Sequence, residues 1–200
     1  FMDKTRTMNR LILLVVMGLW LVQLEAASVQ DWEMFRGDLN HNASRNSQQG
    51  VLPKPALKWR YNTGATVESS PTVVAGRLYV GSFAEHLYAL DIATGKEVWW
   101  FAVNALLRAS PALVDGVLYF GADDNRFYAV NAADGEKKWH IELGEGGQQS
   151  SPVVADGRVY FGAFDHGVYA VDAGSGEVIW RYSTAGGILS SPYLLSLIHI

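Results

Sequence analysis

The feature that most constrains the fold of this chain is an internal repeat of about 40 residues. Three successive stretches begin with the similar sequences SSPTVVAGRLYVG, ASPALVDGVLYFG and SSPVVADGRVYFG, and a fourth begins with SSPYL. Prolines recur at spacings of 40, 41 and 40 residues, at Pro71, Pro111, Pro152 and Pro192. Tryptophans recur in phase with them, at Trp59, Trp99, Trp139 and Trp180. A fixed period of this length indicates one supersecondary unit used repeatedly, as in solenoids and propellers.

Each repeat is predicted to contain four short strands. In the first repeat, PTVV and RLYVG are rich in β-branched and aromatic residues, and a two-residue turn separates them. The turns in the three repeats are Ala75-Gly76, Asp115-Gly116 and Asp156-Gly157. Such pairs favour tight hairpins because they tolerate a positive φ. A third strand (LYALD) and a fourth (VWWFAV) follow, and no helical pattern interrupts them. Four-stranded units of this length predict an all-β fold, a β-propeller.

The phase of the repeat divides the chain into segments. The predicted segments are a closing strand at 57–63, blades at 69–102, 109–143 and 150–184, and the start of a further blade at 190–194. The closing strand carries Trp59 but lacks the three strands that should precede it, so we expect it to complete the last blade of a ring. Residues 57–194 are therefore interpreted as part of a seven- or eight-bladed propeller, which needs roughly 280–320 residues.

The N-terminal residues 1–26 are predicted to be a signal peptide. Lys4, Arg6 and Arg10 precede the apolar run LILLVVMGLWLV, and small residues suited to cleavage follow it. The run is shorter than the roughly 20 residues of a spanning helix. The mature protein is therefore expected to be periplasmic, secreted or at the cell surface, with no transmembrane span after cleavage.

Two further segments flank the repeats. Residues 27–56 are polar and are expected to form a lead-in to the first blade. At the other end, the sequence LSLIHI at 195–200 breaks the repeat in mid-strand. A back-translation of these residues is similar to a transposase end used in sequencing libraries. We interpret them as adapter read-through, so the natural protein is expected to continue.

Composition excludes several classes of function. The chain has 49% apolar and 18% charged residues, which is typical of a packed globular domain. Its net charge is −4 and no basic run follows the first ten residues, so nucleic-acid binding through phosphate neutralisation is not expected. The absence of cysteine from the sequence excludes disulfides, thiolate metal sites and a cysteine nucleophile within it.

The turn before each fourth strand carries a repeated pattern, which in the first repeat is ALDIATGKEVW. A group present in every unit is expected to be structural, because a catalytic group is needed only once. Asp91 and its counterparts Asn131 and Asp172 are expected to accept hydrogen bonds from turn amides. The pattern resembles the tryptophan-docking motif of the pyrroloquinoline-quinone-like (PQQ-like) β-propeller repeat family. This resemblance implies that the tryptophans pack flat between adjacent blades against glycines; the docking residues are Trp59, Gly95, Trp99, Gly135, Trp139, Gly176 and Trp180.

One position varies inside this constant frame, three residues before each repeat proline. The residues at this position are Glu68, Arg108, Gln149 and Leu189. Because the proline opens the innermost strand, the position is expected to face the central channel or its mouth. Such a ring is a candidate site for a polar ligand or a partner loop. The alternative interpretation is a solvated strand entry under no constraint.

Other polar residues give weaker signals of a site. The histidines before the C-terminal tail are His41, His86, His140 and His166, and none has the spacing of a metal-ligand pair. Asp123, Asp124 and Asp165 share the loop between second and third strands, and oxygen ligands suit calcium. Asp124 and Asp165 align in the repeat, however, which favours a turn role. The sequence therefore predicts no metal site and no catalytic residue.

The resemblance implies several possible functions. We favour an exported, non-catalytic binding or scaffold module in the cell envelope, with a protein partner, as in the propeller subunit that serves outer-membrane protein assembly. The alternative is the N-terminal part of a quinone-dependent dehydrogenase, which would use PQQ, calcium and an aspartate base. No cofactor site is visible in this sequence, and the compact repeats without cysteine depart from the enzyme pattern. A third possibility is the sensor domain of a larger regulatory protein.

Overall fold

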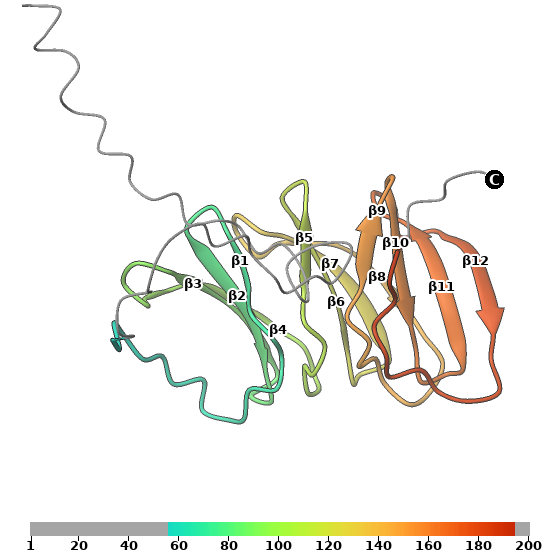
Figure 1. Cartoon of the computed structure of the whole chain (residues 1–200), viewed down its shortest axis with the longest axis horizontal. Coiled ribbons are helices and arrows are strands. Elements are labelled where there is room, and N and C mark those ends of the chain that lie inside the picture. The colour runs from blue at the N-terminus through green and yellow to red at the C-terminus, as the bar shows by residue number, and fades with distance from the viewer. Residues whose placement is uncertain (1–55, 195–200) are drawn as a thin grey trace, which may run out of the picture.

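The computed structural model describes residues 56–194, and all regular elements in that range are β-strands (Figure 1). The first blade contains β1 (Thr72–Val74), β2 (Arg77–Ser82), β3 (His86–Asp91) and β4 (Glu97–Ala102). The second contains β5 (Ala112–Val114), β6 (Val117–Ala122), β7 (Arg126–Asn131) and β8 (Lys137–Glu142). The third contains β9 (Val153–Ala155), β10 (Arg158–Gly162), β11 (Gly167–Asp172) and β12 (Val178–Ser183). Each blade is an antiparallel sheet with its strands in sequence order, which confirms the predicted all-β fold.

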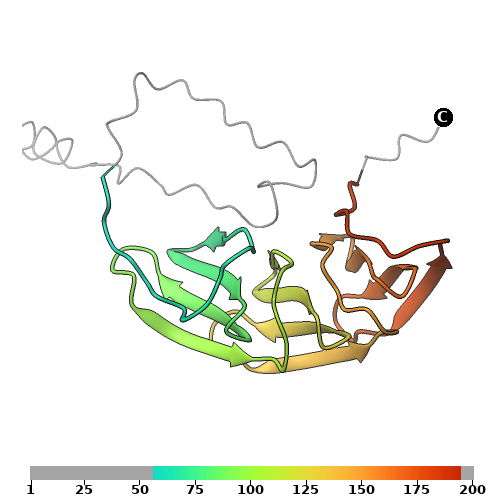
Figure 2. The same cartoon turned by 90° about the horizontal axis from the view of Figure 1, so that it is seen from below.

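The three blades lie side by side along an arc (Figure 2). Strands β1, β5 and β9 line the concave side and contact one another in turn, whereas β4, β8 and β12 lie on the convex side. The predicted signal peptide, most of the lead-in and the predicted adapter segment lie outside the described residues. None of the described residues forms a helix that is long and apolar enough to cross a membrane. The total number of blades stays a prediction.

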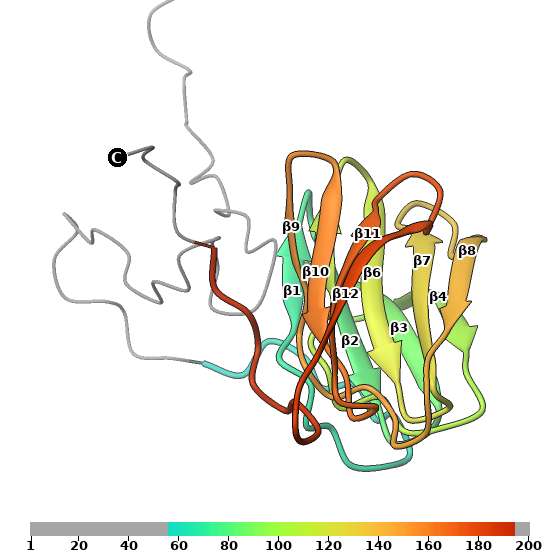
Figure 3. The same cartoon turned by 90° about the vertical axis from the view of Figure 1, so that its right-hand side faces the viewer.

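Each blade has two distinct ends (Figure 3). One end holds the hairpins β1–β2, β5–β6 and β9–β10 together with the turns before β4, β8 and β12, and we call it the hairpin end. The opposite end holds the segments that lead into β1, β5 and β9, and we call it the mouth end. Backbone hydrogen bonds tie each end together, from Ile92 N to Gly76 O at the hairpin end and from Phe83 N to Thr66 O at the mouth end.

Residues 57–63, which were predicted to be a strand, form no strand in the structure. A strand needs a hydrogen-bonded neighbour, and none of residues 56–194 pairs with this segment. Its side chains nevertheless pack on the first blade, where Trp59 and Tyr61 cover a buried cluster of Val80, Tyr88 and Leu90. The segment therefore contacts the first blade through side-chain packing and not through a sheet ladder.

The hairpin turns adopt the backbone conformation that their sequence predicts. Ala75 and Gly76 have φ values of 49° and 77°, and Asp115 and Gly116 have values of 50° and 74°. Two successive positive φ values are typical of the type I′ turn, whose twist matches that of the flanking strands. The third hairpin has the same geometry, so the prediction of tight hairpins is confirmed.

A β-bulge precedes the docking tryptophan of each described fourth strand. The register between third and fourth strands shifts after Ala89, Ala129 and Ala170, and these alanines face Trp99, Trp139 and Trp180 across the sheet. All three alanines are fully buried. A larger side chain at this position would compete with the indole for space, since buried residues are closely packed. The small residue and the bulge together aim the indole out of its own blade.

Three of the four repeat indoles, those of Trp59, Trp99 and Trp139, contact the glycine turn of the blade that follows them. A Cβ atom added to Gly95 would lie 2.5 Å from the ring of Trp59, and one added to Gly135 would lie 2.8 Å from the ring of Trp99. Trp139 lies on Gly176 in the same way, and these glycines also have positive φ values. Only glycine satisfies both the close approach and the left-handed backbone without strain. We call this contact the indole clasp. Trp180 is 43% exposed, and no described glycine turn lies against it.

A tyrosine that the sequence interpretation did not single out strengthens the clasp. Trp99 Nε1 donates to the carbonyl oxygen of Ala132 at 3.2 Å, and Tyr79 OH donates to the same oxygen at 3.1 Å. In the next blade, Trp139 Nε1 and Tyr119 OH share the carbonyl oxygen of Ala173 at 3.0 and 3.1 Å. Burial raises the pKa of both tyrosines, which keeps their hydroxyl groups protonated as donors. The tyrosines recur with the repeat period, which is the signal that identifies them.

The core lies between blades and is not enclosed within any one of them. One buried cluster joins the first and second blades and includes Leu87, Leu118 and Phe120. A second cluster joins the second and third blades and includes Phe127 and Phe161, whose rings stack with centroids 4.0 Å apart. Each blade therefore depends on its neighbour for most of its apolar burial.

Replacement of Trp99 by alanine tests the clasp. We expect Trp99→Ala to lower the free energy of unfolding by about 3–5 kcal/mol, because it removes a large packed ring and its hydrogen bond. The adjacent Trp100 is 52% exposed, so Trp100→Ala should cost about 1 kcal/mol or less. Urea denaturation of both variants measures the difference. Equal losses would contradict a specific role for the clasp.

Candidate functional site

A ladder of serines fixes the segments at the mouth end. Ser70 N donates to Ser110 Oγ at 2.9 Å, and Ser110 N donates to Ser151 Oγ at 3.0 Å. Ser151 N donates in turn to Ser191 Oγ at 3.1 Å. Each serine immediately precedes a repeat proline, so the serine-proline pair links adjacent blades as well as opening the inner strand. The ladder holds the neighbouring entry segments at one spacing.

Glycines in the second strands bring these segments close to the sheet. A Cβ atom added to Gly81 would lie 2.7 Å from Leu107 Cβ, and one added to Gly162 would lie 2.3 Å from Ile188 Cγ2. A serine two positions before the repeat proline adds a hydrogen bond to the second strand. In the first blade, Ser69 Oγ accepts a hydrogen bond from Gly81 N at 3.2 Å. The backbone at the mouth end is therefore positioned by contacts that repeat from blade to blade.

Two of the four predicted ring residues meet at the mouth end. Arg108 Nη1 lies 3.0 Å from Glu68 Oε2, and Arg108 Nε lies 2.9 Å from Asp123 Oδ2. The guanidinium also lies over the ring of Phe83, 4.5 Å from its centroid. The hydrogen bond to Asp123, the largest contribution, and the proximity of Glu68 raise the pKa of Arg108. The result is a charged cluster of two carboxylates and one guanidinium between the first two blades.

The other two predicted ring residues are not part of this cluster. Gln149 is half-buried, and Leu189 is 57% exposed. No hydrogen bond of the described structure joins either side chain to Arg108 or Glu68. The four positions thus present different groups. Glu68 and Arg108 form a charged pair, Gln149 presents an amide, and Leu189 presents an exposed aliphatic side chain.

Gln148, a residue that the sequence interpretation missed, is fully buried beside the predicted ring position. Its Nε2 donates to Gly162 O at 2.9 Å, while its Oε1 is buried and accepts from no described residue. The corresponding residues before the other blades are the aliphatic Leu107 and Ile188. Burial of an unsatisfied amide oxygen costs free energy, so a packing role alone does not explain the glutamine. The sequence signal is a polar residue at an otherwise apolar repeat position.

The three aspartates considered for calcium binding are held by protein donors. Asp123 pairs with Arg108, and Asp124 accepts hydrogen bonds from Tyr128 OH and Arg126 N. Asp165 accepts from Tyr169 OH and from the backbone N–H groups of Gly144 and Gly167. Burial of Asp165 would raise the pKa of its carboxyl, but these hydrogen bonds outweigh burial and lower the pKa. Within residues 56–194, no three acidic or histidine side chains are grouped to hold a metal ion.

The histidines lie apart from one another in the described blades. His86 meets Trp100 edge-on with ring centroids 4.7 Å apart, and His140 stacks on Tyr128 at 5.9 Å. His166 occupies a loop position with a φ of 65°. His41 lies outside the described residues. Their contacts are aromatic packing and loop geometry, and those described form no common site.

Comparison with known proteins places the chain among PQQ-like propellers. The family model described as outer membrane protein assembly factor BamB matches residues 45–193. The crystal structure of BamB from Moraxella catarrhalis is 19% identical, covers 63% of this chain and superposes with a TM-score of 0.56. At that identity the likeness shows the shared fold alone. These matches confirm the resemblance inferred from the docking pattern.

Enzymes of the same fold also match. The quinohemoprotein alcohol dehydrogenase from Comamonas testosteroni is 27% identical over 80% of this chain, with a TM-score of 0.64. The beta-alanine-activating enzyme of Danio rerio is 35% identical over 66 residues, which are 30% of this chain. The chain spans 39% of the Moraxella protein, 28% of the Comamonas enzyme and 6% of the Danio enzyme.

Double-mutant cycles test how the charge cluster is built. Glu68 is half-exposed, so its coupling to Arg108 should be about 0.5 kcal/mol, as for surface ion pairs. Asp123 is better shielded, so its coupling should be about 1–3 kcal/mol. The variants are Arg108→Met, Glu68→Gln and Asp123→Asn, with unfolding measured in urea. A larger coupling to Glu68 than to Asp123 would contradict the described geometry.

Proposed function

The chain belongs to the family described as outer membrane protein assembly factor BamB, and from this premise we propose that it is an exported, non-catalytic binding or scaffold module of the cell envelope. Its partner is a protein, and its location is the periplasm or the cell surface. The basic and apolar N-terminal sequence supports export. Within this proposal, the partner belongs to the machinery that assembles outer-membrane proteins.

One observation carries the proposal. The contacts that hold the blades together repeat at every described interface, whereas the residues presented at the mouth end differ from blade to blade. Indole clasps, the serine ladder and second-strand glycines are common to the repeats. The mouth end instead offers Glu68, Arg108, Gln149 and Leu189 in succession. A rigid frame whose residues differ from blade to blade at one end is suited to recognition of a partner.

The mouth end also has the chemistry of a protein interface. Glu68 is half-exposed and carries a negative charge, and Leu189 offers an exposed apolar side chain. Arg108 is held in place by its two carboxylate partners, so little conformational entropy is lost when it is covered. The negative charge of Glu68 and the exposed side chain of Leu189 favour a partner loop that carries a cationic group beside an apolar residue.

Binding to the soluble part of the outer-membrane assembly barrel protein tests this function. We expect Glu68→Lys and Leu189→Asp, two changes at the mouth end, to weaken binding at least about tenfold through charge repulsion and lost apolar contact. Lys96→Glu and Glu177→Lys are matched controls at exposed positions of the hairpin end and should leave the affinity unchanged. Biolayer interferometry provides the affinities. Failure to bind, or equal sensitivity at the two ends, would reject the proposal.

A second candidate function is the front part of a quinone-dependent dehydrogenase, which the match to the Comamonas enzyme favours. That class would require PQQ, calcium and an acidic base. The described residues do not group acidic side chains for a calcium ion. Dye reduction by the natural protein, supplied with PQQ, calcium and an alcohol, separates the two functions. Reduction above the cofactor-only rate would favour the enzyme, and its absence would favour the binding module.

A further inference from the structure

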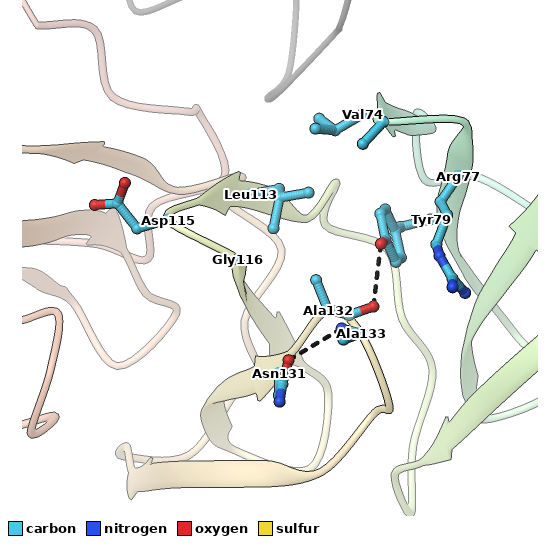
Figure 4. Close-up of a pocket in the computed structure, with 10 residues that line it drawn as sticks. Val74, Arg77, Tyr79, Leu113, Asp115, Gly116, Asn131, Ala132 and Ala133 are labelled. Atoms are coloured by element: carbon cyan, nitrogen blue, oxygen red, sulfur yellow. Dashed lines mark hydrogen bonds between the residues drawn. The ribbon is translucent and has the colours of Figure 1, made fainter.

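A groove opens between the first two blades at the hairpin end, opposite the proposed partner surface (Figure 4). It has a volume of about 320 Å³, at the lower limit of small-ligand sites. Val74, Arg77 and Tyr79 line it from the first blade, and Leu113 and Asn131 line it from the second. The walls are mostly apolar and carry one cationic residue, Arg77, and one acidic residue, Asp115, which is the composition of a site for a small amphipathic molecule.

Arg77 is the unusual member of this lining. Its Nη1 is buried and donates to no residue of the described structure. No carboxylate among residues 56–194 lies within ion-pair distance of its guanidinium. A shielded guanidinium nitrogen without an acceptor costs free energy, so this arrangement favours an acceptor that the described protein does not supply.

The nearby carboxylates are directed elsewhere. Asp91 faces Arg77 across the β2–β3 ladder, but Asp91 Oδ1 accepts hydrogen bonds from Thr94 N at 2.8 Å and Thr94 Oγ1 at 2.7 Å. Asp115 belongs to the groove lining, yet its carboxylate points away from Arg77 (Figure 4). Tyr79 OH is occupied by the carbonyl oxygen of Ala132. The guanidinium of Arg77 is therefore left without an ion-pair partner among the described residues.

The repeat shows that the fold does not require arginine here. The same position of the second blade is Val117, which is buried at 8% exposure and packs in the layer between the second and third blades. The third blade has Arg158, which is exposed and lies opposite Asp172 as Arg77 lies opposite Asp91. Arg77 lines the groove together with residues of the second blade, whereas no described blade follows the third one beside Arg158.

We propose that this groove binds a small organic acid, with its carboxylate on Arg77 and its apolar body between Val74 and Leu113. A guanidinium pairs with a carboxylate through two parallel N–H donors, and shielding strengthens the pair. The volume limits the body to a short aliphatic chain or one aromatic ring. The site is independent of the proposed partner surface, because the two lie at opposite ends of the blades.

Titration of the full 200-residue chain with benzoate tests this site, with calorimetry as the readout. We expect saturable benzoate binding and at least tenfold weaker binding of uncharged benzamide. Arg77→Val, which installs the residue of the second blade, should weaken benzoate binding at least tenfold. The matched variant Arg158→Val should leave it unchanged.

A second variant covers the case in which Arg77→Val fails to fold. Ala133 is an exposed lining residue, so Ala133→Phe should fill the groove without disturbing the core and should abolish benzoate binding. Thermal melting monitored by near-UV circular dichroism verifies that each variant is folded. Three results would overturn the proposal. They are the absence of saturable binding at benzoate concentrations up to about 10 mM, an affinity for benzamide equal to that for benzoate, and a loss of benzoate affinity in Arg158→Val equal to that in Arg77→Val.

Discussion

At each interface between described blades, one backbone carbonyl oxygen accepts the hydrogen bonds that fix how the two sheets face one another. The oxygens of Ala132 and Ala173 each accept a tryptophan N–H and a tyrosine O–H from the preceding blade. The same indole covers the glycine three residues further along, which excludes water from the contact. Because the apolar core lies between blades, these directional contacts fix how neighbouring sheets face one another. The geometry of the mouth end follows from that orientation.

The parts of the fold that repeat could be predicted from the sequence. Three copies of the same turn, glycine and tryptophan identify a structural unit, since random variation would not preserve them in phase. The hairpins at Ala75-Gly76 and Asp115-Gly116 follow from local backbone preferences and adopt positive φ values as predicted. The closing strand at 57–63 stays a prediction, because its pairing depends on a neighbour that the described residues do not contain.

The parts that do not repeat were harder to predict. The sequence identified Glu68 and Arg108 as variable positions, but their ion pair depends on the lateral spacing of two blades. The sequence leaves Asp123 as a possible calcium ligand, and only the three-dimensional arrangement shows its ion pair with Arg108. Gln148 stands out in the aligned repeats, whereas Arg77 has the counterpart Arg158, and the shielding of the unpaired atoms of Gln148 and Arg77 cannot be inferred from sequence spacing.

These observations separate a constant frame from two variable surfaces at opposite ends of the blades. At the mouth end, charged and apolar groups from neighbouring entry segments form a rim suited to a protein partner. At the hairpin end, a single arginine converts one inter-blade groove into a site for a small acid. The variable residues of these two surfaces are not part of the indole clasps. Recognition and stability therefore depend on different residues.

The most direct test of this division is hydrogen–deuterium exchange of the full chain, measured with and without the outer-membrane assembly barrel protein. We expect slower exchange in residues 104–110 and 144–151, which lead into the second and third blades, and no change in residues 92–96 and 132–136. Protection confined to the turns of the hairpin end would contradict it, as would the absence of any protection by the partner.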